Sequence, residues 1–190
     1  MRLKNLSALL AAALLAAPAV SVAENLIVTD DPSQFSPFGV EMDIYEGDPA
    51  TGTKGGPQQC LAVKMKLPKG YFIPKQMIEI DPAKRYRLRF STFSEGEAKI
   101  EANGSCRDDA KQVVRRDEEH SWEFTLKGED EKKTVTAPTG GWVPMEVVIG
   151  PGEEFEFPAG STKAELIIWI RDSAPETVVY VKDLSAEEVR

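Results

Sequence analysis

The side chains best suited to binding a ligand lie in a strand-like run near the end of the chain, residues 166–171. If Ile168 and Ile170 face a hydrophobic core, strand alternation places Trp169 and Arg171 together on the outward face. An indole ring can stack on the apolar face of a sugar, and a guanidinium group beside it can donate hydrogen bonds to hydroxyl groups. In the opposite register, Trp169 is buried and this site does not exist.

A second set of candidate ligand-binding side chains is a row of arginines. Arg85, Arg87 and Arg89 alternate with apolar residues over 85–90. A row of guanidinium groups suits the carboxylate or sulfate groups of an acidic glycan. The alternative is that glutamates on neighbouring strands of the same sheet pair with them. We expect Arg87 and Arg89 to join the Trp169 site if the two strands share a sheet.

Residues for catalysis are sparse. His120 is the only histidine, which excludes a multi-histidine metal centre and leaves one candidate base, in a highly charged stretch. The sequence has no Gly-x-Ser-x-Gly nucleophile motif and no phosphate-binding loop. Carboxylates are plentiful, so a glycan-acting hydrolase with a pair of acidic residues stays an alternative. The pattern favours a binding protein over an enzyme.

The first 23 residues have the three parts of a secretory signal peptide. Two basic residues begin it, residues 6–20 are rich in Leu and Ala, and small residues lead up to Ala23. The apolar run contains Pro18 and is short for a bilayer span, so an uncleaved membrane anchor is the weaker interpretation. Cleavage after Ala23, or alternatively after Ala19, predicts a secreted or periplasmic protein without a further membrane span. We expect residues 24–190 to form one domain.

The chain is acidic. It contains 31 Asp and Glu residues against 23 Lys and Arg, a formal charge of −8, and loss of Arg2 and Lys4 with the signal makes it −10. Nucleic acids and anionic lipid surfaces are bound through clustered basic residues, so neither is an expected partner. A glycan or another exported protein is the partner that we expect.

Cys60 and Cys106 are the two cysteines. In an oxidising compartment a disulfide is the first prediction, and closing this loop would stabilise the fold by about 4 kcal/mol on the chain-entropy model. Two free, buried thiols are the alternative.

Short strand-like runs recur from residue 25 to residue 184, separated by Gly, Pro, Asn and Asp, and none has helical periodicity. Strands that bury one face need a second sheet, which predicts an all-β, two-sheet antiparallel sandwich. We expect the longest loop over 46–59. Asn103-Gly104 predicts a two-residue hairpin turn, after which Cys106 begins the return strand.

The remaining aromatic residues are expected to be mainly structural. Trp122 shares a strand face with other apolar residues and should pack in the core, and Trp142 should pack in the core or at a sheet edge. Tyr71 and Phe72 either line a cleft at the sheet edge or plug the end of the sandwich.

Four parts of the sequence follow one another in an order known from one fold. They are residues 24–26, residues 76–82 with 86–90, residues 141–151, and residues 164–169 with 178–184. This order resembles carbohydrate-binding modules with a galactose-binding-like jelly roll, the type appended to bacterial glycanases. The resemblance spans nearly the whole mature chain and implies a non-catalytic module that binds a carbohydrate.

The resemblance also implies a structural calcium ion near the chain ends. Asp183 matches the acidic residue of the last strand, and Asp30 could supply a further oxygen ligand. Lys182 stands where the family often has a second acidic residue, and the alternative role of Asp183 is to cap a strand end. The same fold hosts protein-binding and structural modules, so a β-sandwich without sugar affinity is the alternative function.

Overall fold

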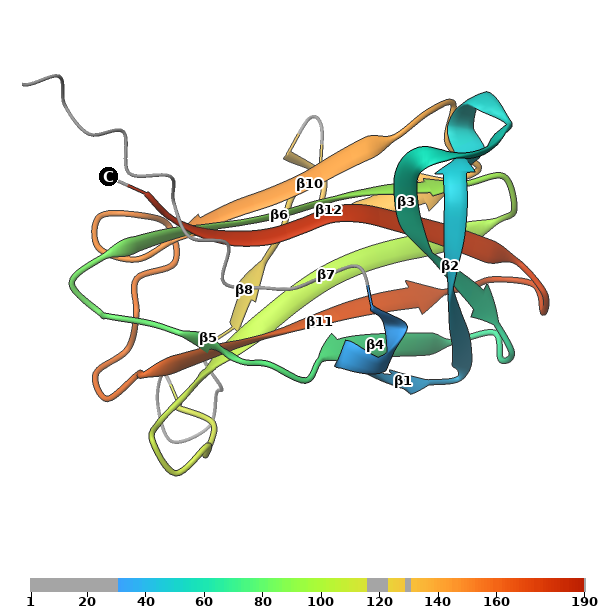
Figure 1. Ribbon diagram of the computed structural model, residues 1–190. Helices are drawn as coiled ribbons and strands as arrows, with labels where there is room; N and C mark the ends of the chain where they lie inside the picture. Colours follow the sequence, from blue (N-terminus) through green and yellow to red (C-terminus); the bar gives the residue numbers. More distant parts are fainter. Residues whose placement is uncertain (1–30, 116–122, 129–130, 190) are drawn as a thin grey trace, which may run out of the picture.

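The computed structural model describes residues 31–115, 123–128 and 131–189 (Figure 1). These ranges are almost entirely β-strand and turn, with two single-turn 3-10 helices, η1 (Pro32–Gln34) and η2 (Pro49–Thr51). None of the described helices is long and apolar enough to cross a membrane. The strand predicted near residue 25, and the predictions for Asp30, His120 and Trp122, lie outside the described residues.

The described strands form two antiparallel sheets, which confirms the predicted sandwich. Sheet A has the order β1–β4–β11–β7–β8, with β5 paired to β11 and β9 paired to β7, and sheet B has the order β10–β6–β12–β3–β2. Sheet A comprises β1 (Phe35–Phe38), β4 (Gly70–Pro74), β5 (Ile78–Glu79), β7 (Ala98–Arg107), β8 (Glu123–Thr125), β9 (Thr134–Ala137) and β11 (Lys163–Arg171). Sheet B comprises β2 (Val40–Asp48), β3 (Thr53–Met65), β6 (Arg85–Ser94), β10 (Val143–Ile149) and β12 (Val178–Val189).

The core lies between the two sheets and is built by strand alternation. In β11, Leu166, Ile168 and Ile170 are at most 2% exposed, while the residues between them are only partly buried. In sheet B, Leu61 and Val63 of β3 face the same core. Complete burial of one such side chain contributes about 1.5–3 kcal/mol to the free energy of folding. Burial of the inward-facing side chains is therefore the main contribution that holds the two sheets face to face.

The predicted hairpin turn at Asn103-Gly104 is wrong. Both residues lie inside β7, where Asn103 pairs with Ile167 and Gly104 pairs with Leu166. Glycine is needed here for space: a Cβ atom on Gly104 would lie 2.3 Å from Cζ of Phe124, which is fully buried. The Asn-Gly pair therefore reflects packing beneath sheet A and not a turn.

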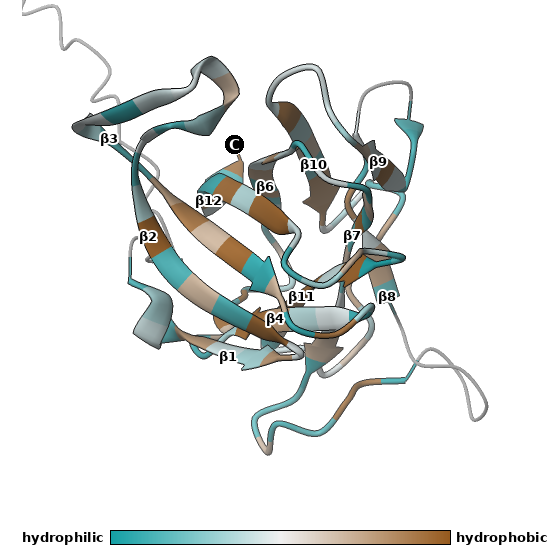
Figure 2. Cartoon of the chain, turned by 90° about the vertical axis from the view of Figure 1, so that its right-hand side faces the viewer, coloured by the Kyte–Doolittle hydropathy of each residue, from teal (hydrophilic) through white to brown (hydrophobic). Residues whose placement is uncertain are grey.

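The prediction of a loop over 46–59 is also wrong, because β3 begins at Thr53 and pairs with β2 to form a long hairpin. We call its outer part, residues 45–59, the hairpin arm. A register shift between Glu46 and Gly47 bends it. Figure 2 shows the arm rising at one side of sheet B, with β10 at the other side, so that sheet B has a concave outer face.

The predicted disulfide is not formed: Cys60 and Cys106 are free, buried thiols. Cys106 of β7 belongs to the core between the sheets. Cys60 of β3 precedes Leu61, which faces that core, so alternation turns the Cys60 side chain to the opposite side of sheet B. Burial raises the pKa of each thiol to about 11. The alternative of two free, buried thiols is the one that the structure contains.

Candidate ligand-binding surfaces

The structure places Trp169 and Arg171 on the outer face of sheet A, as the alternation of β11 predicts. Ile168 and Ile170 are 0% exposed, and Trp169 and Arg171 are partly exposed. Trp169 lies opposite Tyr71 of β4, and Tyr71 lies opposite Phe38 of edge strand β1. Three aromatic side chains thus stand in a row across three neighbouring strands, a relation that residue spacing alone does not reveal.

The rings of this row pack against one another. The Tyr71 and Trp169 centroids are 4.7 Å apart, and the Phe38 and Tyr71 rings are stacked at 5.3 Å. Nζ of Lys69 and Cζ of Arg171 each lie 5.0 Å from the centroid of the Trp169 ring. Much of the Trp169 surface is therefore covered within the molecule, and Phe38 is the most exposed ring, at 55%. The sequence left open whether Tyr71 and Phe72 line a cleft or plug the end of the sandwich. In the structure Phe72 is a core residue and Tyr71 faces outward.

Arg87 and Arg89 do not join this surface, because β6 belongs to sheet B. The condition under which both arginines were expected to join Trp169 and Arg171, a shared sheet, is therefore not met, and the four residues do not form one site. On the outer face of sheet B, Arg87 forms an ion pair with Glu146 at 3.2 Å and Arg89 with Glu187 at 2.9 Å. These glutamates stand on the flanking strands β10 and β12, so cross-strand pairing, the alternative stated for the sequence, is what the structure shows.

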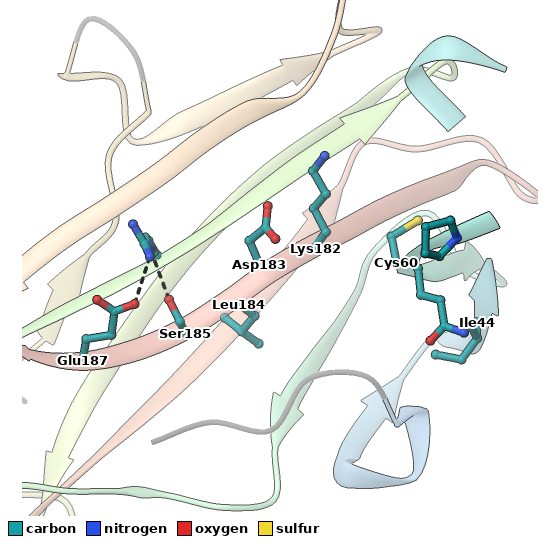
Figure 3. Close-up of a pocket in the computed structure, with 10 residues that line it drawn as sticks. Ile44, Cys60, Lys182, Asp183, Leu184, Ser185 and Glu187 are labelled. Atoms are coloured by element: carbon teal, nitrogen blue, oxygen red, sulfur yellow. Dashed lines mark hydrogen bonds and ion pairs between the residues drawn. The ribbon is translucent and has the colours of Figure 1, made fainter. Parts of the chain in front are cut away.

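A hollow lies on the concave outer face of sheet B, beside the hairpin arm. It has a volume of about 450 Å3, within the range of roughly 300–1,000 Å3 typical of ligand sites. Two further hollows adjoin it, and Asp183 lines all of them. Figure 3 shows Lys182 and Asp183 projecting to the same side of β12. The hollow is lined by Ile44, Pro57, Gln59, Cys60, Arg89, Lys182, Asp183, Leu184, Ser185 and Glu187.

A β-bulge explains how Asp183 reaches the hollow. Lys182 pairs with Ser91 and Ser185 pairs with Arg89, so Asp183 and Leu184 together face the single residue between those partners. Leu184 is 1% exposed and fills the core position. Asp183 is the extra residue, with a left-handed φ of 55°, and its side chain is exposed. Its carboxylate forms no hydrogen bond or ion pair with any described residue.

The hairpin arm also contacts Trp142, and Asp48 and Trp142 both line one of the two adjoining hollows. Oδ1 of Asp48, in the arm, accepts a hydrogen bond of 2.8 Å from Nε1 of Trp142, which precedes β10. Nζ of Lys182 lies 4.1 Å from the centroid of the Trp142 ring. Beneath the arm, Phe93 and Tyr180 stack on the outer face of sheet B at 6.1 Å. Trp142 is thus partly buried at the edge of sheet B, in line with its structural prediction.

The described residues do not supply a calcium site at Asp183. Among them, no three Asp, Glu, His or Cys side chains come together as a ligand group. Lys182 is the immediate neighbour of Asp183 and would oppose a cation. The other predicted ligand, Asp30, lies outside the described residues, so the calcium ion stays a prediction.

Sequence reasoning missed the hollow, although one signal was present. Two consecutive polar residues, Lys182 and Asp183, stand between Val181 and Leu184, which breaks the strict alternation of a strand. A bulge is the standard way to keep both apolar side chains in the core. The arm, Trp142 and Arg89 come from distant parts of the chain, so no local pattern could have joined them to Asp183.

Comparison with known proteins identifies the fold. No protein-family model matches the sequence, and no curated protein sequence matches it. Among solved structures, the CBM22-1 xylan-binding domain from Paenibacillus barcinonensis Xyn10C matches with a TM-score of 0.54 at 9% identity, over 90% of this chain and 99% of that domain. The chain therefore has the β-sandwich fold of carbohydrate-binding modules, as the resemblance predicts.

Other matches are parts of larger proteins. The Clostridium thermocellum endo-1,4-beta-D-xylanase 10B modules, complexed with xylohexaose, match with a TM-score of 0.50 at 11% identity, over 89% of this chain and 28% of that one. The enzymatically active domain of bacteriophage CBA120 tailspike protein 4 matches with a TM-score of 0.54 at 12% identity, over 84% of this chain and 20% of that one. At these identities the matches establish the fold alone.

Proposed function

We propose that this protein is an exported, non-catalytic module that binds a carbohydrate in the hollow lined by Asp183. The observation that carries the proposal is the Asp183 carboxylate, which a bulge holds at the meeting point of three hollows without a partner among the described residues. A carboxylate can accept hydrogen bonds from two neighbouring hydroxyl groups of a sugar. The signal-peptide pattern of residues 1–23 supports export, and the fold shared with carbohydrate-binding modules supports the ligand class.

The charges around the hollow favour a ligand without strong net charge at this site. Two cations, Arg89 and Lys182, and two carboxylates, Asp183 and Glu187, line it. Arg89 donates to Oγ of Ser185 at 3.2 Å and to Oε1 of Glu187 at 2.9 Å, so its guanidinium group is already bound. The arginines that suggested an acidic glycan, Arg87 and Arg89, are each paired with a glutamate on a neighbouring strand. If an acidic glycan binds, its charge has to be met elsewhere on the molecule.

Two observations favour binding over hydrolysis. A glycosidase acid needs a pKa raised by an apolar pocket or by a second carboxylate. The described carboxyl groups with a resolved shift, Asp31, Glu41, Asp172 and Glu176, all have a lowered pKa because hydrogen bonds and lysine neighbours stabilise the charged form. In the hollow, the Glu187 carboxylate is already held in an ion pair with Arg89 at 2.9 Å.

The experiment is a binding survey of the mature protein on neutral and acidic polysaccharides, followed by calorimetry with Asp183→Asn. Asparagine keeps the shape and tolerates the left-handed φ, so the melting temperature should not change. Loss of a hydrogen bond to a charged group should weaken binding about ten-fold or more. The control is Asp109→Asn, which removes the same charge from an exposed loop residue outside the hollow. Unchanged affinity in Asp183→Asn would place the ligand elsewhere, and turnover of a polysaccharide would exclude the non-catalytic assignment.

A further inference from the structure

We propose a second ligand surface on the opposite side of the sandwich, which takes an anionic polysaccharide and makes the module bivalent. This inference rests on the proposed function. The surface lies at the edge of sheet A where β1, β4 and β11 meet, and we call it the aromatic corner. It consists of Phe38, Leu67, Lys69, Tyr71, Trp169 and Arg171.

The aromatic corner gathers the exposed apolar side chains of the described residues. Phe38 is 55% exposed and Leu67 is 47% exposed, and these are the large hydrophobic side chains that the described surface leaves open. They are neighbours, since the backbone N–H of Leu67 donates to the carbonyl oxygen of Gly39 at 3.2 Å. Gathered apolar side chains at one point of an exported, acidic protein mark an interaction surface.

The charge at the corner is positive, in contrast to the chain as a whole. Lys69 lies over the Trp169 ring and has no carboxylate partner among the described residues. Nε of Arg171 lies 3.3 Å from Oε2 of Glu101, without the geometry of a hydrogen bond. Glu101 also accepts from Oγ1 of Thr134 at 3.1 Å. Lys69 and Arg171 therefore outweigh Glu101, and an anionic ligand complements them.

The shape of the corner favours a polysaccharide over a peptide. At the corner, Phe38, Tyr71 and Trp169 stand in a row on the outer face of three neighbouring strands, whereas a peptide helix is bound in a groove. On edge strand β1, Pro37 lacks the backbone N–H that an added peptide strand would need. An extended chain of sugar rings needs neither feature, because aromatic rings and cations at the surface are enough to bind uronate or sulfate groups and ring faces.

The test uses the mature protein with polygalacturonate as the anionic probe, at low and high salt. Phe38→Ala and Lys69→Gln should each weaken binding about ten-fold, by analogy with the loss of aromatic stacking or of a charge-assisted hydrogen bond. Both side chains are exposed or at the surface, so the melting temperature should stay unchanged. Trp169→Ala should weaken binding too, but its ring packs on Tyr71, so it is a supporting variant only.

Matched controls separate the two surfaces. Lys133→Gln removes one exposed lysine charge outside both surfaces and should leave binding unchanged. Asp183→Asn should reduce binding at the hollow and spare polygalacturonate. The inference is overturned if polygalacturonate does not bind, if it is lost in Asp183→Asn while the corner variants bind normally, or if polyglutamate binds the corner equally well. If neutral glycans still bind through the hollow, the proposed function survives that failure.

Discussion

Replacing Gly104 with alanine tests the packing beneath sheet A. The added Cβ would lie 2.2 Å from the carbonyl oxygen of Glu165 and 2.3 Å from Cζ of Phe124, and neither atom can move easily. Glu165 is held in the pairing of β7 with β11, and Phe124 is 0% exposed. Overpacking of a core costs about 1–3 kcal/mol and sometimes more. Because two fixed neighbours are both too close, we expect about 3 kcal/mol, or a fall of roughly 6–12 °C in melting temperature.

The assay is urea unfolding of the mature protein, followed by far-UV circular dichroism. Asn103→Thr is the companion variant: in β7 its side chain is partly exposed, so a β-branched residue should change stability by no more than about 0.5 kcal/mol. In a hairpin turn the same change would be harmful, because that position needs a left-handed backbone. Phe124→Leu in the Gly104→Ala background should recover part of the loss by making room. A loss below about 1 kcal/mol for Gly104→Ala, together with a larger loss for Asn103→Thr, would refute the strand assignment.

Three further predictions follow from the same structure. Alkylation without reductant should label both Cys60 and Cys106 once the protein is unfolded, and mass spectrometry showing them linked would contradict the free thiols. Burial raises the pKa of both thiols from 9.0 to about 11, so the native state keeps them protonated where the unfolded state loses the protons. The free energy of unfolding should therefore be constant below pH about 9 and decline as the pH rises towards about 11. The decline should be smaller in Cys106→Ala. Trp142→Phe keeps an aromatic ring but loses the hydrogen bond to Asp48, so it should cost about 1 kcal/mol and speed amide hydrogen exchange in the hairpin arm, whereas unchanged exchange would show that this bond does not hold the arm.

The sequence was most informative where the signal is local. In β11, alternating aliphatic residues predicted a strand over 166–171 and limited Trp169 to two registers, of which the structure has the one with Trp169 outward. Alternation also led to a two-sheet sandwich, because each strand carried one apolar face that needed a partner. These inferences depend on the two-residue period of a strand, which can be recognised in a short stretch of sequence without knowing its neighbours in the fold.

Tertiary structure decided which residues meet. Sequence could not tell that Arg87 and Trp169 belong to different sheets, because sheet membership depends on pairings between residues far apart in the chain. The Asn103-Gly104 pair misled because its local meaning, a turn, gave way to the distant ring of Phe124. The place of Asp183 depends on the bulge of β12 against β6 and on the hairpin arm, which contributes Pro57 and Gln59 to the hollow. Periodicity fixes the direction of a side chain, whereas long-range strand pairing and packing fix its neighbours, and a binding site is made of neighbours.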